Sequence, residues 1–384
     1  MSFFNSIDNG SLISGLTALL VTGVIVMTQK WHGKHSHDTV DGPQKFHDES
    51  TPRVGGIAIF LALVVACFVS PRPLSALLCP MVIASLPAFL AGLTEDLTKR
   101  VRPFYRLLAT MVSGVAAWWL TGYSLTHLEF AGSYSILVYL PVAVAFTAFA
   151  VAGVAHSINM IDGFNGLASG TIMLMFLALG LIAFDAGDTQ LAQLCLTMIV
   201  VMIGFFVFNF PFGKIFLGDG GAYLVGFLLA WVAVMLPMRN PQISIWSPLL
   251  VCAYPFNEAL FTMARRFAGK VSLGAPDSKH LHSLIKIKIV SCYFAHLHKK
   301  MRNSLVAPFC WIYAALVSSI AIWQYTNTNL LIAAWLISFF LYVILYTRLK
   351  GLATSVTHYR KTKASPAAIS RVGEVNGILQ QQEG

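Results

Sequence analysis

Residues 191–209 read LAQLCLTMIVVMIGFFVFN, an apolar run without a charged side chain. A helix needs about 20 mostly apolar residues to cross a bilayer, and residues 222–237 follow with a second run of this kind. Further apolar stretches on both sides of these two runs bring the expected number of spans to eleven. The other apolar stretches are 12–28, 54–70, 74–93, 103–121, 136–155, 168–184, 245–265, 307–324 and 330–347.

The composition of the whole chain agrees with this pattern. Of the 384 residues, 57% are hydrophobic and 11% are charged, whereas an average soluble domain has about 25% charged residues. The sequence therefore predicts an all-α fold, a polytopic transmembrane helical bundle. Residues 1–350 form the expected integral membrane domain. Residues 351–384 are polar and basic, so we expect a largely disordered cytoplasmic tail.

The positions of the 26 Lys and Arg residues orient the bundle. With eleven spans and the N-terminus outside, every Lys and Arg residue except Arg72 and Arg239 falls on one face of the membrane. Because cytoplasmic loops are rich in Lys and Arg, we expect the crowded face to be cytoplasmic. The net charge of +10 then needs no nucleic acid as a partner. The same face holds nearly all polar groups capable of chemistry, so we expect cytoplasmic active-site loops.

Two of these inner motifs offer oxygen ligands for a hard cation. The first, HSINMIDGFNGL, places Asn159, Asp162 and Asn165 at three-residue spacing, which would put them on one face of a helix. The second, FLGDGG, places Asp219 in a glycine-rich turn just before a span. Mg²⁺ is commonly held by one or two carboxylates and by substrate phosphates. Asp219 is therefore the first candidate for a metal ligand.

Two further motifs supply charge at the same face. Glu95 and Asp96 are adjacent carboxylates that repel each other, an arrangement that suits metal binding or proton transfer. His280 and His282 follow Lys279 in a long basic loop. No third soft ligand for zinc is close in the sequence. Contact of these histidines with an anionic diphosphate is therefore the favoured interpretation.

The loop before the second span contains Lys45, His47 and Arg53, which we expect at the level of the lipid headgroups, where a lipid phosphate lies. Four of the five motifs also have a plain structural explanation. These are a polar helix end, a tight turn, a solvated helix end with internal ion pairs and a positive-inside loop. Polar groups so close to the membrane are usually retained for function.

Taken together, the ordered motifs between about residues 41 and 283 resemble the polyprenyl-phosphate N-acetylhexosamine-1-phosphate transferases of glycosyltransferase family 4. That superfamily includes the bacterial undecaprenyl-phosphate GlcNAc-1-phosphate transferase, the phospho-MurNAc-pentapeptide translocase and the eukaryotic dolichyl-phosphate enzyme. The resemblance implies Mg²⁺, or Mn²⁺ as a substitute, at Asn159 and Asp219. It implies catalytic and nucleotide-sugar roles for Asp162 and Asn165, and contact of the two histidines with the diphosphate.

Two positions depart from the family pattern. The acidic pair is usually Asp-Asp, and here it is Glu95-Asp96, which puts the proton-transfer role of Glu95 in question. The histidine motif often ends with a third histidine, and here Ser283 takes that place. Because the pentapeptide-carrying branch has a contiguous histidine run, the second departure disfavours that branch.

The implied reaction is attack of a lipid phosphate oxygen on the β-phosphorus of a UDP-sugar, with release of UMP. This would be the first membrane step of a cell-envelope polysaccharide of the O-antigen type, in the bacterial cytoplasmic membrane. The expected partners are polyprenyl phosphate, a UDP-N-acetylhexosamine, the membrane and a second copy of the chain in a homodimer. A secondary transporter is the alternative, with Glu258 as the acidic residue placed at depth.

Overall fold

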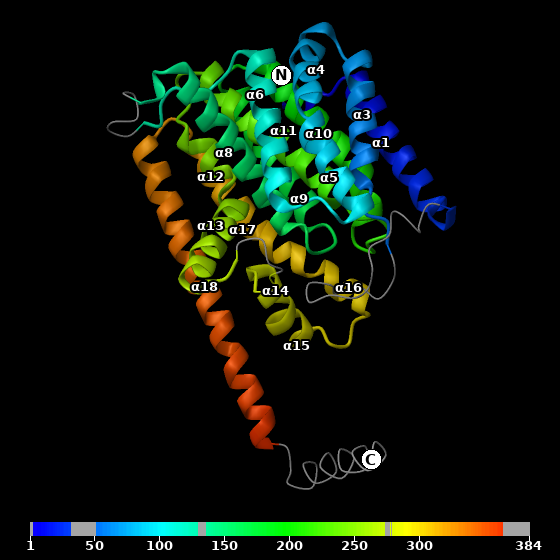
Figure 1. Ribbon diagram of the computed structural model, residues 1–384, viewed down its shortest axis with the longest axis vertical. Helices are drawn as coiled ribbons and strands as arrows, with labels where there is room; N and C mark the ends of the chain where they lie inside the picture. The colour runs from blue at the N-terminus through cyan, green and yellow to red at the C-terminus, as the bar shows by residue number, and fades with distance from the viewer. Residues whose placement is uncertain (1–2, 32–50, 130–135, 273–276, 278, 364–384) are drawn as a thin grey trace.

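The computed structural model describes residues 3–31, 51–129, 136–272, 277 and 279–363 (Figure 1). Helices form all the regular secondary structure in these ranges. In chain order they are η1 (Phe3–Ser6), α1 (Asn9–Met27), α3 (Gly55–Val69), α4 (Arg72–Ala84), α5 (Leu86–Thr98), α6 (Pro103–Thr121), α8 (Leu140–Ile161), α9 (Leu167–Asp185), α10 (Thr189–Asn209), α11 (Gly218–Arg239), α12 (Trp246–Val251), α13 (Ala253–Ala268), α14 (Leu281–Ile285), η2 (Lys286–Val290), α15 (Ser291–Tyr293), α16 (Lys299–Ser304), α17 (Val306–Trp323) and α18 (Thr328–Lys363).

Every apolar stretch predicted from the sequence falls on a helix or on a pair of helices. Within the described ranges, 7 helices are long and apolar enough to cross a membrane, or 8 if the pair α4 and α5, bent by 48°, forms one span. The stretch 245–265 is also divided, because α12 ends at Val251 and α13 begins at Ala253. The chain is therefore a polytopic helical membrane protein.

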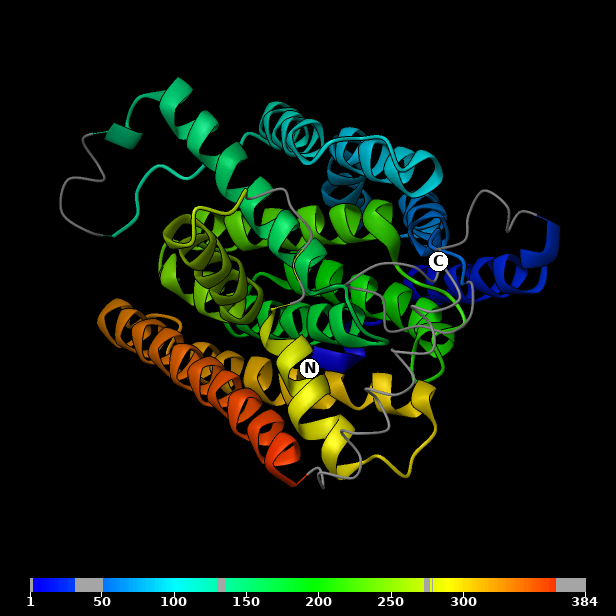
Figure 2. The same ribbon diagram turned by 60° about the horizontal axis from the view of Figure 1, so that its bottom comes forward.

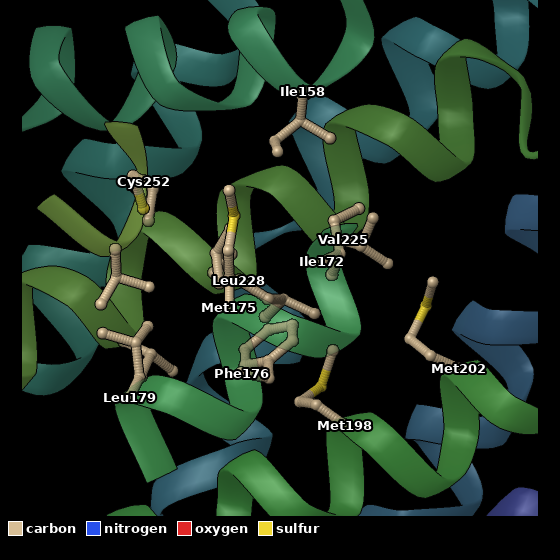
Figure 3. Packing of buried hydrophobic residues seen from close by; sticks show 14 of the residues in the cluster. Ile158, Ile172, Met175, Phe176, Leu179, Met198, Met202, Val225, Leu228 and Cys252 are labelled. Atoms are coloured by element: carbon tan, nitrogen blue, oxygen red, sulfur yellow. The ribbon is translucent and has the colours of Figure 1, made fainter. Parts of the chain in front are cut away.

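Helix α11 lies at the centre of the bundle and α18 at its edge (Figure 1). In the most apolar window of α11, 89% of the residues are buried, compared with 22% for α18. A helix that is apolar all round is expected to be surrounded by protein or lipid. Here α11 packs against α3, α5, α8 and α9. Side chains from four helices, among them Ile158, Phe176, Met198 and Val225, meet in this core (Figure 3).

Close packing at the start of α11 depends on glycines in the helices that cross it. A Cβ atom at Gly92 of α5 would lie 2.6 Å from the backbone of Asp219. A Cβ atom at Gly56 of α3 would lie 2.3 Å from the backbone nitrogen of Gly221. Because real Cβ atoms do not approach other heavy atoms so closely, these two glycines let α3 and α5 reach the start of α11.

The short helices α14, α15 and α16 gather below one end of the bundle (Figure 1), and α14 packs beside α18 (Figure 2). They belong to the long connection between α13 and α17. Helix α18 runs past the bundle at the same end, and its helical backbone continues to Lys363, beyond the boundary at 350 expected for the membrane domain. Residues 364–384 of the expected tail lie outside the described residues.

Candidate active site

Asp219 lies in the first turn of α11, which begins at Gly218. The glycine-rich turn expected before this span is therefore already helical. The side chain of Asp219 is nearly buried, and its two oxygens face different donors. Oδ1 accepts hydrogen bonds from Nη2 of Arg53 at 2.9 Å and from Nδ2 of Asn159 at 3.1 Å. Oδ2 forms an ion pair with Nη1 of Arg106.

The adjacent carboxylates Glu95 and Asp96 point to different places. Asp96 is 1% exposed and accepts from the backbone N–H groups of Asp219 at 2.9 Å and Gly220 at 2.8 Å. It thereby binds the N-terminus of α11, where the helix dipole favours a negative charge. Glu95 instead accepts from the backbone N–H of Val101 at 2.7 Å, in the turn between α5 and α6. The structure thus brings Asp96, and not the Glu95 carboxylate, to Asp219.

Backbone pairing between distant segments places Arg53. The N–H of Phe216 donates to the carbonyl of Pro52 at 2.8 Å, and the N–H of Gly55 donates to the carbonyl of Phe216 at 3.0 Å. This holds the start of α3 beside the start of α11. Nε of Arg53 lies 3.6 Å from Oδ1 of Asp96. Arg53 therefore stands between two carboxylates, rather than free at a headgroup.

Arg106 is a site residue that the sequence interpretation missed, since it was counted only as a cytoplasmic base. It lies in the first turn of α6, and its guanidinium also stands 5.9 Å from the ring centroid of Tyr223. A positive charge at a helix N-terminus is unfavourable by itself. That conflict was the one signal in the sequence that Arg106 needs an anionic partner. The Tyr223 hydroxyl in turn donates to Oδ1 of Asn159 at 3.3 Å.

The three oxygen-bearing residues of the HSINMIDGFNGL motif do not share a helix face. Helix α8 ends at Ile161, and Asp162 is its C-terminal cap. Asn165 lies beyond the helix end, and its Nδ2 donates to the carbonyl of Pro211 at 3.1 Å. The expectation of one common face was wrong because the chain turns at Asp162. Asn159 faces Asp219, whereas Asn165 fixes the turn after α10.

Asp162 is electrostatically coupled to the site. Desolvation of its carboxyl group raises its pKa to about 7, with help from the Asp219 and Asp96 carboxylates and against the effect of Arg53. A carboxyl group with a pKa near neutrality can exchange a proton under physiological conditions.

The histidine motif lies against the same turn. The ring of His282 packs edge-on against Phe164, with 5.7 Å between the ring centroids. Burial lowers the pKa of His282 to about 4, although the Glu258 carboxylate opposes this shift. Nδ1 of His280 lies 3.0 Å from Oε1 of Glu258. The side chain of Lys279 is exposed, and its backbone N–H donates to Asp277 at 2.9 Å.

The donor set can accommodate Mg²⁺ only together with phosphates. Among the described residues, no three His, Cys, Asp or Glu side chains form a ready-made metal site. Asp219 offers one carboxylate, and Asn159 beside it offers an amide oxygen once that amide rotates. Mg²⁺ often takes so few protein ligands and completes its shell with water and substrate phosphate. Lys45 and His47, predicted near the lipid phosphate, lie outside the described residues.

Comparisons with known proteins point in one direction. An undecaprenyl-phosphate alpha-N-acetylglucosaminyl 1-phosphate transferase of Yersinia pestis is 29% identical over 255 residues, which cover 64% of this chain and 69% of the relative. A probable transferase of the same kind from Bacillus subtilis is 24% identical over 318 residues, 81% of this chain and 85% of the relative. A phospho-N-acetylmuramoyl-pentapeptide-transferase of Streptococcus thermophilus is 26% identical over 350 residues, 82% of this chain and 97% of the relative.

The family comparison covers the centre of the site. The model described as glycosyl transferase family 4 matches residues 78–237. This range runs from α4 through α11 and includes Asp96, Arg106, Asn159 and Asp219. Relatives of both the GlcNAc and the pentapeptide branch match, so the expectation against the pentapeptide branch stays a prediction. The matched range and the names of these relatives agree: the central part of this chain, residues 78–237, is similar to glycosyl transferase family 4.

Proposed function

We propose that this chain transfers an N-acetylhexosamine-1-phosphate group from a UDP-sugar to undecaprenyl phosphate, releasing UMP and leaving a lipid-diphosphate sugar. The names of the relatives support this reaction and give no support to a transporter. The observation that carries the proposal is the convergence of Arg53 and Arg106 on Asp219 at one end of the membrane bundle. Phosphoryl transfer asks mainly for such placed charges.

The proposed setting is the inner face of a bacterial cytoplasmic membrane, with eleven spans and the N-terminus outside. The positions of the site residues along their helices support this topology. Asp96 is near the end of α5 and Arg106 near the start of α6, while Asn159 is near the end of α8 and Asp219 near the start of α11. Alternating spans bring these helix ends to one face, which is also the face rich in Lys and Arg.

The roles proposed for the residues follow from their contacts. Asp96 holds the N-terminus of α11 in place and thereby positions Asp219. Arg53 and Arg106 can turn from Asp219 to phosphate oxygens, which guanidinium groups bind in a bidentate manner. A phosphate monoester has a second pKa of about 6, so the lipid phosphate is mostly ionised at neutral pH. Asp162 is then proposed to orient the lipid phosphate or to accept a single proton from it, and a strong base is not required.

Mg²⁺ is the proposed cofactor, with Mn²⁺ as a substitute, and Asp219 and Asn159 are its proposed ligands. When bound, the ion supplies neutralisation of the negative charge on the diphosphate. Both oxygens of Asp219 are engaged by arginines and Asn159 in the present arrangement. These three donors leave one lone-pair site of the carboxylate for an ion, and a guanidinium group that turned away from Asp219 would find a new partner in a substrate phosphate.

The proposed sugar is GlcNAc, as in the names of two of the relatives. Asn165 and Lys279 are proposed to contact the nucleotide sugar, and Lys45 and His47 the headgroup of the lipid. The long prenyl chain stays in the bilayer while its phosphate meets a soluble nucleotide at the membrane boundary. A site at the ends of spanning helices suits two substrates that arrive from different phases.

The test uses the purified full chain in detergent with undecaprenyl phosphate and a panel of UDP-N-acetylhexosamines. UMP release is measured with Mg²⁺ and with a chelator. We expect UMP that depends on the lipid, on the sugar nucleotide and on the divalent ion. Absence of UMP with every donor would contradict the transferase assignment. Release of UMP without the lipid would indicate a hydrolase, and full activity with the chelator would remove Mg²⁺ from the proposal.

A further inference from the structure

Glu258 of α13 is a buried carboxylate for which the reaction described so far has no use. Its side chain is 0% exposed, and a carboxylate inside a membrane bundle is costly unless donors surround it. Both of its oxygens accept from the backbone N–H of Leu281, at 3.3 and 3.2 Å. Oε1 also lies 3.0 Å from Nδ1 of His280. Because an ionised carboxylate only accepts, this contact requires a proton on Nδ1 of His280.

The ring of His282, the second histidine of the motif, is nearly parallel to the ring of His280. The rings of His280 and His282 are stacked, with centroids 5.2 Å apart and planes inclined by 13°. Nδ1 of His282 lies 3.9 Å from Oε2 of Glu258, beyond hydrogen-bond distance. Its Nε2 faces the opposite way, toward the turn after α8, where a Cβ atom at Gly163 would lie 3.3 Å from it. That turn carries Asp162.

Glu258 contacts the histidine loop through the ring of His280 and the backbone N–H of Leu281. Other ionisable groups near it are Tyr254 of α13, Cys310 of α17 and Tyr342 of α18. None of them carries a positive charge at neutral pH, so they cannot balance the carboxylate. The carboxylate is instead met by hydrogen-bond donors, Nδ1 of His280 and the backbone N–H of Leu281, and the loop that carries them is further held by the ion pair of Arg265 with Asp277.

We propose that Glu258 is a positioning residue: it fixes the Nδ1 edge of His280, on whose ring His282 stacks, so that Nε2 of His282 faces the phosphate groups transferred at the site. This inference rests on the proposed function, because it assigns the histidines to its substrate. It also gives a reason for the division of the predicted ninth span. The break between α12 and α13 lets α13 carry a carboxylate under the histidine loop.

A double-mutant cycle tests the coupling directly. The variants are Glu258→Gln, His280→Ala and the pair of both, each as the purified full chain. Glutamine presents an N–H₂ group to partners that are themselves donors, so the ring of His280 loses its fixed orientation. We expect kcat to fall about 100-fold in Glu258→Gln, with KM for the UDP-sugar nearly unchanged. Adding Glu258→Gln to His280→Ala should cause little further loss.

Asn257→Ala is the matched control in the same helix. Asn257 is also 0% exposed, but its Nδ2 donates to the hydroxyl of Tyr313 at 2.9 Å, away from the histidines. Thermal unfolding in detergent should show a loss of stability in both variants. Only Glu258→Gln should be coupled to His280→Ala. Equal coupling for Asn257→Ala, or full additivity of Glu258→Gln with His280→Ala, would overturn the inference.

The ring orientation can also be measured without turnover. Nitrogen-15 NMR of histidine-labelled protein should show a protonated Nδ1 on His280 in the wild type and loss of this state in Glu258→Gln. Glu258→Asp keeps the charge and should retain more activity than the glutamine variant. A wild type inactive with every donor would overturn the proposed function. An active wild type with an unprotonated Nδ1 on His280 would overturn the inference about Glu258 alone.

Discussion

The two ends of α11 both join carboxylates to arginines, but they do so in different ways. At its C-terminal end, one arginine, Arg239, forms a fork with Asp188, with Nε to Oδ2 at 2.6 Å and Nη2 to Oδ1 at 2.9 Å, and Asp188 also accepts from the Asn240 amide at 3.3 Å. At its N-terminal end, one carboxylate, Asp219, shares two arginines and an amide. In the first cluster, one arginine balances the charge of one carboxylate. The second holds more charged groups than one pair needs, which is typical of a place for a ligand.

The helix dipole favours both arrangements equally, because Asp219 is in the first turn and Arg239 in the last. The dipole therefore does not explain the difference. Burial by itself would raise the pKa of Asp188, yet the hydrogen bonds from Arg239 and from the backbone of Leu191 lower it below its ordinary value. The pair thus stabilises the fold at neutral pH, and this contribution is lost only as the pH falls below about 3.8.

The largest effect is expected from Asp219→Asn, which keeps the shape of the side chain and removes its charge. Turnover should fall about a thousandfold or more, since the residue serves both arginines and the proposed cation. UMP release at saturating substrates measures this, with thermal unfolding as a check that the variant is folded. Near-normal turnover would show that Asp219 is not part of the active site and that the two ends of α11 do not differ in function.

A smaller loss, about 100-fold, is expected from Arg106→Gln, because one of two guanidinium groups near the phosphates is removed. Arg106→Lys should recover little of it, since an ammonium group cannot make the bidentate contact. Steady-state kinetics with the UDP-sugar and the lipid varied in turn would show which substrate the group holds. If Arg106→Lys were as active as the wild type, the residue would serve only as a charge partner of Asp219.

Breaking the pair at the other end of α11 should change stability and not catalysis. Asp188→Asn removes hydrogen bonds to a charged group, each worth about 1.5–3 kcal/mol. The melting temperature in detergent should fall, while kcat of the folded fraction stays near that of the wild type. A loss of kcat comparable to that of Arg106→Gln would show that the two ends of α11 are coupled, and would contradict a purely structural role for the pair of Arg239 and Asp188.

The smallest effect is expected from truncation after Lys363, the last residue of α18. None of the predicted site residues lies beyond this point, so UMP release and membrane insertion should both be unchanged. The measurement is specific activity per inserted protein. A marked loss would give the C-terminal segment a part in the reaction that its composition did not suggest.

The sequence identified most of the acidic and amide members of the site, because their motifs are local. Asp96, Asn159 and Asp219 were each recognisable from a few neighbouring residues, and the structure joins all three. Arg106 was missed, since an arginine at the expected cytoplasmic end of a span is ordinary, and only its three-dimensional partner distinguishes it. Asn165 was placed with the wrong partners for a related reason, because the end of α8 at Ile161 decides which way it points.

By itself, the amino-acid sequence determined that this chain is a bundle of membrane helices, because apolar runs of spanning length have one stable environment. It also predicted which face carries the chemistry, since the positions of charged and polar residues can be read directly from the sequence. The tertiary structure decided which charges meet. Arg53 and Asp219 are separated by 166 residues, and Glu258 and His280 by 22. Such pairs depend on helix crossings, which packing at residues such as Gly92 sets and which no local pattern encodes.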